Sequence, residues 1–402
     1  MIAINKLSPE ERDQVRIACA YLFSPVLARQ EEFVASLQLV QVDDAFGEKE
    51  KRYNPYLHPD EPRDVLARRA DRLEKIKASY RLLKTYLEPQ TEAPRITQAP
   101  TIIAVGGAKG GVGKSLLSVN LGILLASRGR RTILIDLDLG GCNLHFYLGE
   151  RALEWDISDF FNRKASSLNE IVIPTQYGPG LIGGGKAELG AANMPFARKL
   201  KLLKAIKALE ADCIIIDLGG DTSYNIIDFF LLADRGVVVT SCEPASYVGA
   251  YNFIKVALQR KLSRLCGAES EYRKTADPDL KHLIDETVIA SNRNGGNFVA
   301  KLMQRLQAER PDQTELVKGI LRGFEPQVVV NMIDAHVSAE AVVARIQEVA
   351  RKMLSIQVGH LGSLPYQSEV KNSSLELVPS LIKYPDGKFS EALRNIYYQL
   401  IR

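Results

Sequence analysis

The stretch TIIAVGGAKGGVGKSLLSVNLGILLAS, residues 101–127, decides the fold of this chain. Residues 101–105 are apolar and rich in β-branched side chains, which predicts a buried strand. A glycine-rich turn follows at 106–115, and an apolar helix is expected at 115–127. A glycine-rich turn between a strand and a helix N-terminus presents successive backbone N–H groups to an anion. The stretch therefore predicts a phosphate-binding loop in an α/β sheet.

The order of residues in this loop gives its polar side chains separate roles. The segment fits the pattern GxxxxGK[ST], except that Ala108 stands at the first glycine position. Lys114 is expected to reach the β- and γ-phosphates, and the Ser115 hydroxyl is expected to ligate Mg²⁺. An accidental glycine-rich turn is the alternative, and the strand–loop–helix context disfavours it. The residues expected to bind the nucleotide here are Gly110, Gly111, Val112, Gly113, Lys114, Ser115 and Leu116.

Outward from the loop, short apolar strands alternate with amphipathic helices. Expected strands lie at 131–135, 213–216, 237–240 and 328–330, and a helix is expected at 196–209. This alternation predicts a doubly wound α/β fold with a mostly parallel sheet. Residues 262–324 carry helical periods without a clear buried strand, so they predict a mainly helical insertion.

Carboxylates follow two of the expected strands. Asp136 and Asp138 come after strand 131–135, and Asp217 follows strand 213–216. Ligands of open α/β sheets bind at the carboxyl ends of the strands. If strand 131–135 continues, Asp136 and Asp138 share one face and one site, since side chains alternate along a strand. Asp217 fits the Walker B pattern, in which a carboxylate holds Mg²⁺. Loop capping remains the alternative for Asp136 and for Asp138.

The segment KGGVGKS, with its additional lysine at Lys109, resembles the deviant Walker A loop of the MinD/ParA family. The resemblance implies ATP and Mg²⁺ as cofactors and a homodimer closed across the nucleotides. It implies catalytic roles for Lys109, which would reach the partner's nucleotide, for Lys114, and for Asp138, which would orient the attacking water. Ser115, Asp136 and Asp217 would then form the Mg²⁺ environment. An ordinary solvated side chain is the alternative for Lys109.

Two positions near the end of the chain are assigned to the nucleotide base by the same resemblance. Asn331 follows the strand at 328–330, where a family asparagine reads the adenine edge. An amide side chain can donate and accept together, as that edge requires. Pro365 lies in an expected loop, 365–368, where the family packs a proline-containing segment against the base. A strand-end turn residue is the alternative for Asn331.

Two further segments, GGCNLHFYLG at 140–149 and EPASYVGAYNFIK at 243–255, resemble the flagellar-number regulators of the FlhG or FleN type. The insertion at 262–324 departs from their pattern. The resemblance implies a slow, partner-stimulated ATPase that switches between states and positions or regulates a cellular partner. The alternatives are an ATP-dependent metabolic ligase of the same superfamily and a nucleotide-dependent scaffold with little hydrolysis.

Composition narrows the remaining function classes. The five cysteines form no CxxC pair, which excludes iron–sulfur carriers of this superfamily, and no HExxH pattern suggests a metalloenzyme. A net charge of +4 does not by itself predict nucleic-acid binding. No signal peptide or membrane-spanning run is expected, so a cytoplasmic location is predicted, with peripheral contact to membrane or nucleoid left open. The basic residues of helix 196–209 are interpreted as a solvated face, and the last helix is expected to dock on the core.

The N-terminal part differs in character from the rest. Residues 88–100, EPQTEAPRITQAP, hold three prolines among polar residues and predict a linker at 89–100. The expected domains are therefore a helical module at 1–88 and an ATPase domain at 101–402. The HPD tripeptide at 58–60 lies between expected helices, so the module looks like a degenerate J-domain that binds an unknown protein partner. A working co-chaperone and a plain helical hairpin are the alternatives.

Overall fold

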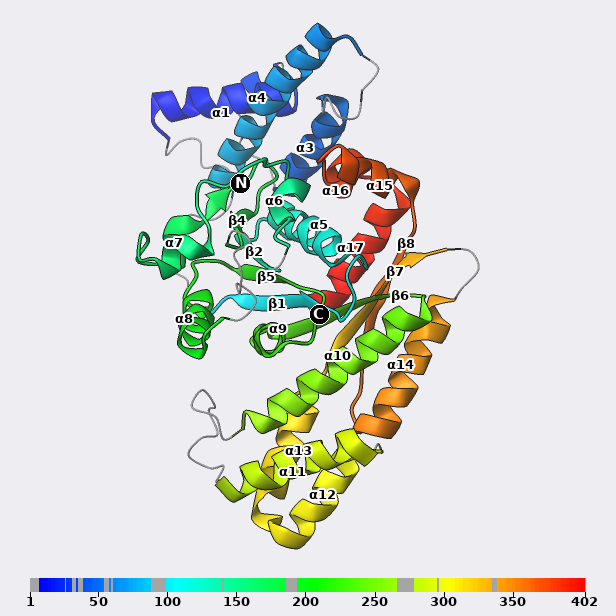
Figure 1. Cartoon of the computed structure of the whole chain (residues 1–402). Helices are drawn as coiled ribbons and strands as arrows, with labels where there is room; N and C mark the ends of the chain where they lie inside the picture. Colours follow the sequence, from blue (N-terminus) through cyan, green and yellow to red (C-terminus); the bar gives the residue numbers. More distant parts are fainter. Residues whose placement is uncertain are drawn as a thin grey trace. The chain divides into compact units, whose positions relative to one another are not determined.

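The computed structural model describes residues 7–25, 27–30, 34, 39–53, 58, 61–87, 99–138, 141–185, 194–265, 278–294, 296–334 and 338–401. The chain divides into two compact units, Met1–Thr97 and Gln98–Arg402 (Figure 1). Each unit has a hydrophobic core of its own.

The second unit is built on an eight-stranded sheet with the strand order β3-β4-β2-β5-β1-β6-β7-β8. Only the short β3–β4 pair at one edge is antiparallel; every other neighbouring pair is parallel. The mostly parallel α/β sheet predicted from the sequence is thus confirmed. The strands are β1 Thr101–Gly106, β2 Thr132–Leu137, β3 Ile173–Pro174, β4 Gly180–Ile182, β5 Cys213–Leu218, β6 Arg235–Ser241, β7 Gln327–Ile333 and β8 Gly359–Pro365.

Helices cover both faces of this sheet, which explains why the central strands are apolar throughout. Side chains of α8, α9, α10 and α14 share one core with one face, and those of α5 and α17 share a second core with the other. The last helix, α17, buries Phe389, Leu393 and Ile396, so the expected docking on the core is confirmed. The covering helices are α5 Lys114–Ser127, α6 Leu144–Tyr147, α7 Ile157–Phe161, α8 Phe196–Lys207, α9 Tyr224–Phe230, α10 Pro244–Ser263, α14 Ala339–Leu354, α15 Ser368–Leu375, α16 Ser380–Lys383 and α17 Lys388–Leu400.

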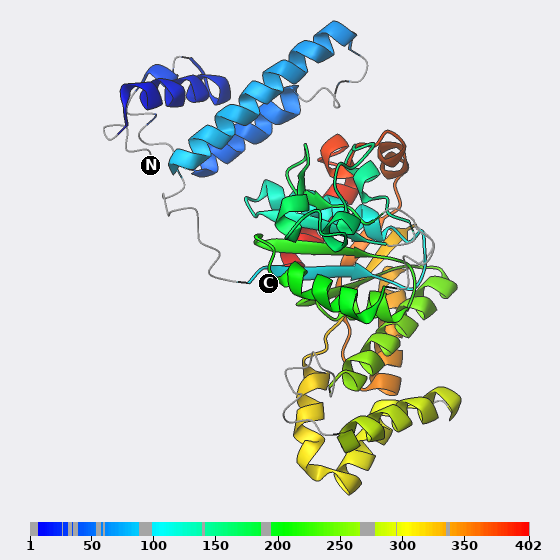
Figure 2. The same ribbon diagram turned by 60° about the vertical axis from the view of Figure 1, so that its left-hand side comes forward.

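The segment between α10 and β7 extends away from the sheet. Figure 2 shows its helices beyond the ends of α10 and α14. The described residues between Arg264 and Phe324 hold no strand, in agreement with the predicted helical insertion. Its helices are α11 Pro278–Asn294, α12 Phe298–Glu309, η5 Pro311–Gln313 and α13 Thr314–Arg322.

The first unit is helical. Its core buries the apolar side chains of Val15, Leu22, Ile76 and Leu83, which lie on α1 and α4. Its elements are α1 Pro9–Leu22, η2 Leu27–Arg29, α3 Leu39–Tyr53 and α4 Arg63–Leu87. Residues 54–57 and 59–60, which carry most of the proposed HPD region, lie outside the described residues. The J-domain likeness therefore stays a prediction.

One sequence interpretation is wrong within α8. Arg198, Lys201, Lys204 and Lys207 are exposed, as a solvated basic face requires. The Lys199 side chain, however, is only 6% exposed and forms an ion pair with Asp228 of α9. The side chain turns inward because a buried carboxylate on the neighbouring helix needs a counter-charge.

Candidate functional site

The loop between β1 and α5 has the backbone conformation that its glycines permit. Gly111 and Gly113 have φ angles of 76° and 90°, in the left-handed region that glycine tolerates best. A Cβ on Gly113 would lie 2.1 Å from Nδ2 of Asn331, so no side chain fits there. A Cβ on Gly110 or Gly111 would meet no atom within 4 Å. The loop is therefore open on this side, as a cradle for a phosphate must be.

Lys114, the first residue of α5, lies inside the loop. Its side chain is buried, and Nζ donates a hydrogen bond to the Lys109 carbonyl over 3.1 Å. Burial lowers the pKa of Lys114, and the nearby carboxylates of Asp217, Asp138 and Asp221 oppose that shift. The ammonium is thus held where it can meet phosphate oxygens from within the loop.

Lys109 points the other way. Its side chain is 41% exposed and forms an ion pair with Glu243, the residue that precedes α10. Both partners are well exposed, so this pair contributes little to stability and is easily broken. The sequence alone indicated no role for Glu243, because the two residues are 134 positions apart.

Asp217, near the end of β5, is tied to the first turns of α5. Ser115 Oγ donates to its Oδ2 over 2.6 Å, and Ser118 Oγ donates to its Oδ1 over 2.8 Å. Ser118 is a site residue that the sequence did not predict. Its signal was a serine three positions after Ser115 in a mostly apolar helix, and residues at this spacing share a helix face.

Asp136 lies beside Asp217 on the neighbouring strand. The two residues are register partners in the β2–β5 pair. Asp136 accepts hydrogen bonds from the backbone N–H groups of Asp138 over 3.1 Å and Leu144 over 3.0 Å. These bonds are those of a loop-capping residue, the alternative kept open for Asp136. A role in the Mg²⁺ environment stays a prediction.

Asp138 follows β2, which ends one residue earlier at Leu137. Its side chain is partly exposed, and a Cβ on Gly219 would lie 3.0 Å from its Oδ1. A Cβ on Gly220 would lie 2.9 Å from the backbone nitrogen of Gly110. The segment after β5 therefore packs closely against both Asp138 and the phosphate loop.

Burial raises the pKa of both carboxylates. Burial, together with the charge of Asp136, raises the pKa of Asp217 to about 7. Burial also raises the pKa of Asp136 to about 6. A pair of this kind favours a proton or a cation. Carboxylate and hydroxyl oxygens are the hard donors that Mg²⁺ prefers, so Ser115 and Asp217 fit this ion.

A complete protein cage for a metal is not seen in the described part of the chain. No group of three or more His, Cys, Asp or Glu side chains there could hold a metal ion. Mg²⁺ does not require such a cage, because it usually binds one or two carboxylates together with substrate phosphates and water.

The structure places the two residues assigned to the base differently from each other. Asn331, in β7, is buried; its Nδ2 donates to the Val112 carbonyl over 2.8 Å, and its Oδ1 accepts from the Met332 N–H. It therefore supports the phosphate loop, and adenine recognition by Asn331 stays a prediction. The expected loop position of Pro365 is wrong, because Pro365 is the last residue of β8. Strand β8 extends to this proline, whose ring is tolerated at the end of an edge strand.

A parallel α/β sheet with this loop, a lysine inside it and a buried carboxylate beside its serine defines a phosphate-loop nucleotide-binding domain. The chain belongs to the family described as CbiA, the CobQ/CobB/MinD/ParA nucleotide binding domain, whose model matches residues 103–379.

Curated relatives match shorter spans of the chain. The chain is 30% identical over 160 residues to the antiactivator FleN of Pseudomonas aeruginosa, covering 39% of this chain and 55% of FleN. It is 29% identical over 170 residues to the flagellum site-determining protein YlxH of Helicobacter pylori, covering 40% and 54% of the two chains. The chain thus spans about half the length of these relatives.

Solved structures are similar over a larger part of the chain. The septum site-determining protein MinD of Pyrococcus horikoshii, complexed with Mg-ADP, has a TM-score of 0.49 and 17% identity, covering 75% of this chain and 96% of MinD. A ParA family ATPase from Chlorobium tepidum has a TM-score of 0.47 and 16% identity, covering 75% and 98%.

Among the described residues, no helix is both long and apolar enough to cross a bilayer.

Proposed function

We propose that this chain is an ATP-hydrolysing molecular switch that dimerises across its bound nucleotides and thereby positions or regulates a cellular partner. ATP and Mg²⁺ are its cofactors. The observation that carries the proposal is the opposite orientation of the two loop lysines. Lys114 is buried within the loop, whereas the Lys109 side chain is 41% exposed on the loop's outer side.

An exposed cation on a phosphate loop is suited to work on a second molecule. Lys114 serves the nucleotide of its own chain, and a surface lysine beside it can reach the γ-phosphate in a facing protomer. There it stabilises charge in trans, as an arginine finger does. Its ion pair with Glu243 holds Lys109 at the surface at little energetic cost, since exposed pairs are weak.

Hydrolysis is assigned to Asp138, with Ser115 and Asp217 holding Mg²⁺. Asp138 lies against Gly219, and Gly220 lies against the phosphate loop, so a change at the γ-phosphate reaches the segment after β5 directly. Ordering and release of such segments is a common way in which nucleotide hydrolysis becomes a conformational signal.

The names of the relatives support a positioning or regulatory role. One is an antiactivator, another determines a flagellum site, and MinD determines a septum site. One solved neighbour is a MinC:MinD cell division protein complex, in which a protein of this family binds another protein. For this chain, the helical first unit is proposed to bind a protein partner.

The test measures molar mass and ATP turnover together. Wild type is compared with Lys109→Ala, Asp138→Ala and Lys114→Ala by light scattering after size exclusion, with ADP or ATP. Wild type should be monomeric with ADP and dimeric with ATP. Asp138→Ala should stay dimeric with ATP and lose turnover, while Lys109→Ala should bind ATP but remain monomeric.

Matched controls separate the switch from simple nucleotide binding. Lys114→Ala should lose ATP binding altogether, and Lys352→Ala, at another exposed ion pair, should behave as wild type. A wild-type protein that stays monomeric with ATP, together with an unaffected Lys109→Ala variant, would refute the proposal.

A further inference from the structure

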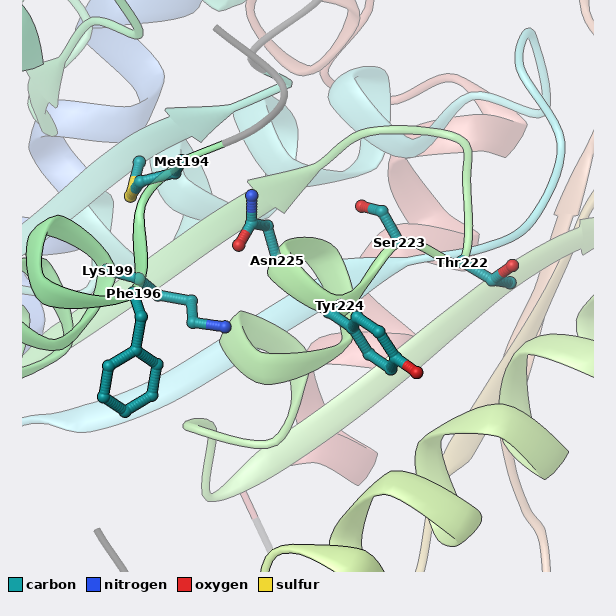
Figure 3. Close-up of a pocket in the computed structure, with 7 residues that line it drawn as sticks. All are labelled: Met194, Phe196, Lys199, Thr222, Ser223, Tyr224 and Asn225. Carbon is teal, nitrogen blue, oxygen red and sulfur yellow. The ribbon is translucent and has the colours of Figure 1, made fainter. Parts of the chain in front are cut away.

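A pocket lies between α8 and α9, on the face of the sheet opposite α5 and α17. Its volume is about 480 Å³, and its lining residues are Met194, Phe196, Lys199, Thr222, Ser223, Tyr224 and Asn225. Figure 3 shows Phe196 and Lys199 on the α8 side and Thr222, Ser223 and Tyr224 on the other. The volume is in the range of ligand-binding clefts, which is roughly 300–1,000 Å³.

Two aromatic residues that line this pocket are unusually exposed. Tyr224 is 70% exposed and Phe196 is 57% exposed. Rings left in solvent at the two sides of a hollow are typical anchors of protein interfaces, where aromatic residues supply much of the binding energy. The pocket is therefore an open docking site rather than an enclosed chamber for a small metabolite.

The surroundings are basic, which determines the chemistry of the occupant. Three cations, Lys199, Arg260 and Arg264, are ion-paired with the single carboxylate of Asp228, so this group of side chains carries a net positive charge. The Arg260 guanidinium lies 4.8 Å from the centre of the Tyr224 ring, and the Lys199 ammonium lies 5.8 Å from that of Phe196. Cations near both rings, within a group of side chains whose net charge is positive, are complementary to an acidic ligand that carries an apolar group.

One side of the pocket is fixed and the other adjoins the nucleotide site. Asp228, beneath the pocket on α9, is ion-paired with Lys199 of α8 and with Arg260 of α10. The opposite side begins at Thr222, two residues after Gly220, and Gly220 lies against the phosphate loop. A change at the γ-phosphate therefore alters one wall of the pocket while the other stays in place.

We propose that this pocket binds an acidic peptide segment of a partner protein, with an apolar side chain inserted between Phe196 and Tyr224, and that the nucleotide state controls this binding. The inference rests on the proposed switch function and adds a second partner-binding surface to the one proposed for the helical first unit. A peptide is favoured over nucleic acid because the aromatic residues form one hollow rather than a track along which successive bases could stack.

The test uses short fluorescein-labelled peptides and fluorescence anisotropy on the full chain. The first peptide has a central Leu-Phe pair flanked by glutamates, the second has lysines in place of the glutamates, and the third has glycines in place of Leu-Phe. An oligo-dT strand serves as competitor. The glutamate peptide with Leu-Phe should bind best, more weakly at high salt, and with affinities that differ several-fold between ADP and a non-hydrolysable ATP analogue.

Substitutions locate the binding. Tyr224→Ala and Phe196→Ala should each weaken binding about tenfold or more, the loss expected at an interface hot spot. Tyr398→Ala serves as control, because Tyr398 is 47% exposed on α17, which covers the other face of the sheet. Its affinity for the peptide should equal that of wild type.

Three results would overturn the inference: no preference for the acidic peptide, no effect of Tyr224→Ala, or displacement by oligo-dT more effective than by unlabelled peptide. Equal affinity with ADP and the ATP analogue would overturn the nucleotide control. Failure of the two proposals can be told apart. A protein that dimerises with ATP but binds no peptide refutes only the pocket, whereas peptide binding without ATP-dependent dimerisation refutes only the switch.

Discussion

Replacing Asp228 with asparagine should destabilise the second unit strongly. The carboxylate lies on α9 with its side chain only 1% exposed, and it is ion-paired with Lys199. Arg260 donates two hydrogen bonds to it, over 2.8 and 2.9 Å, and Arg264 donates one over 3.0 Å. One carboxylate thus connects α8, α9 and α10, so its charge holds three elements together.

The size of the effect follows from what the substitution leaves behind. The Lys199 side chain is only 6% exposed, so in Asp228→Asn its ammonium stays buried without a counter-charge. Removing one member of a buried ion pair costs about 3–5 kcal/mol in unfolding free energy. Exposed pairs contribute only about 0–1 kcal/mol. Glu348→Gln, at a pair with side chains 62% and 54% exposed, is therefore a matched control with a small effect.

The pH dependence of unfolding provides a second test of the stabilising charge on Asp228. Burial would raise the pKa of Asp228, but hydrogen bonds from Arg260 and Lys199 and the nearby charge of Arg264 outweigh it, so the pKa is lowered. A carboxylate whose pKa is lower in the folded state stabilises the protein above its unfolded pKa of about 3.9. That stabilisation is lost as the pH falls through the folded pKa. The difference between wild type and Asp228→Asn should therefore shrink below about pH 4.

The change in unfolding free energy can be measured by urea unfolding of the second unit, followed by tryptophan fluorescence. The single tryptophan, Trp155, belongs to the second unit and reports on it selectively. With a slope of about 1–3 kcal/mol per molar urea, the midpoint should fall by about 1 M or more. A loss below about 1 kcal/mol, similar to that of Glu348→Gln, would show that the buried charge cluster does not hold the helices as argued.

Three further predictions concern the nucleotide site. Gly113→Ala should abolish ATP binding in a fluorescent-nucleotide titration. The added Cβ would lie 2.1 Å from Asn331 Nδ2, and residue 113 has a φ of 90°. The control Gly319→Ala, whose Cβ meets no atom within 4 Å, should bind ATP normally. Ser118→Ala should lower the unfolding free energy by about 1–3 kcal/mol, because a buried oxygen of Asp217 loses its hydrogen-bond donor. The same variant should bind Mg²⁺ more weakly in calorimetry. Unchanged Mg²⁺ affinity would contradict a role of Ser118 in positioning Asp217. The pKa of Asp217 is raised to about 7, so the nucleotide-free, Mg²⁺-free protein should lose stability as the pH rises from about 4 to 7, and Asp217→Asn should flatten this slope in thermal unfolding. An equally steep slope in the variant would contradict the assignment.

The sequence by itself determined the fold class and the phosphate loop, because both depend on local patterns. Strand, glycine turn and helix follow one another directly in residues 101–127, and β-branched runs mark the other central strands. The structure confirms these strands and extends most of them by a few residues, since the ends of apolar runs are set by pairing with neighbours. Strand β8, with the sequence GHLGSLP, was not predicted, because it is not a run of apolar residues.

Only the tertiary structure brought together the contacts that complete the site. Ser118 meets Asp217 across 99 residues, and Lys109 meets Glu243 across 134. Lys199 looks like one more lysine on a basic helix, yet it is buried because Asp228 lies on the helix beside it. Local patterns report which element a residue belongs to and which face it occupies. They do not report the side chain that faces it from another element, because packing of the whole sheet and its helices decides that pairing.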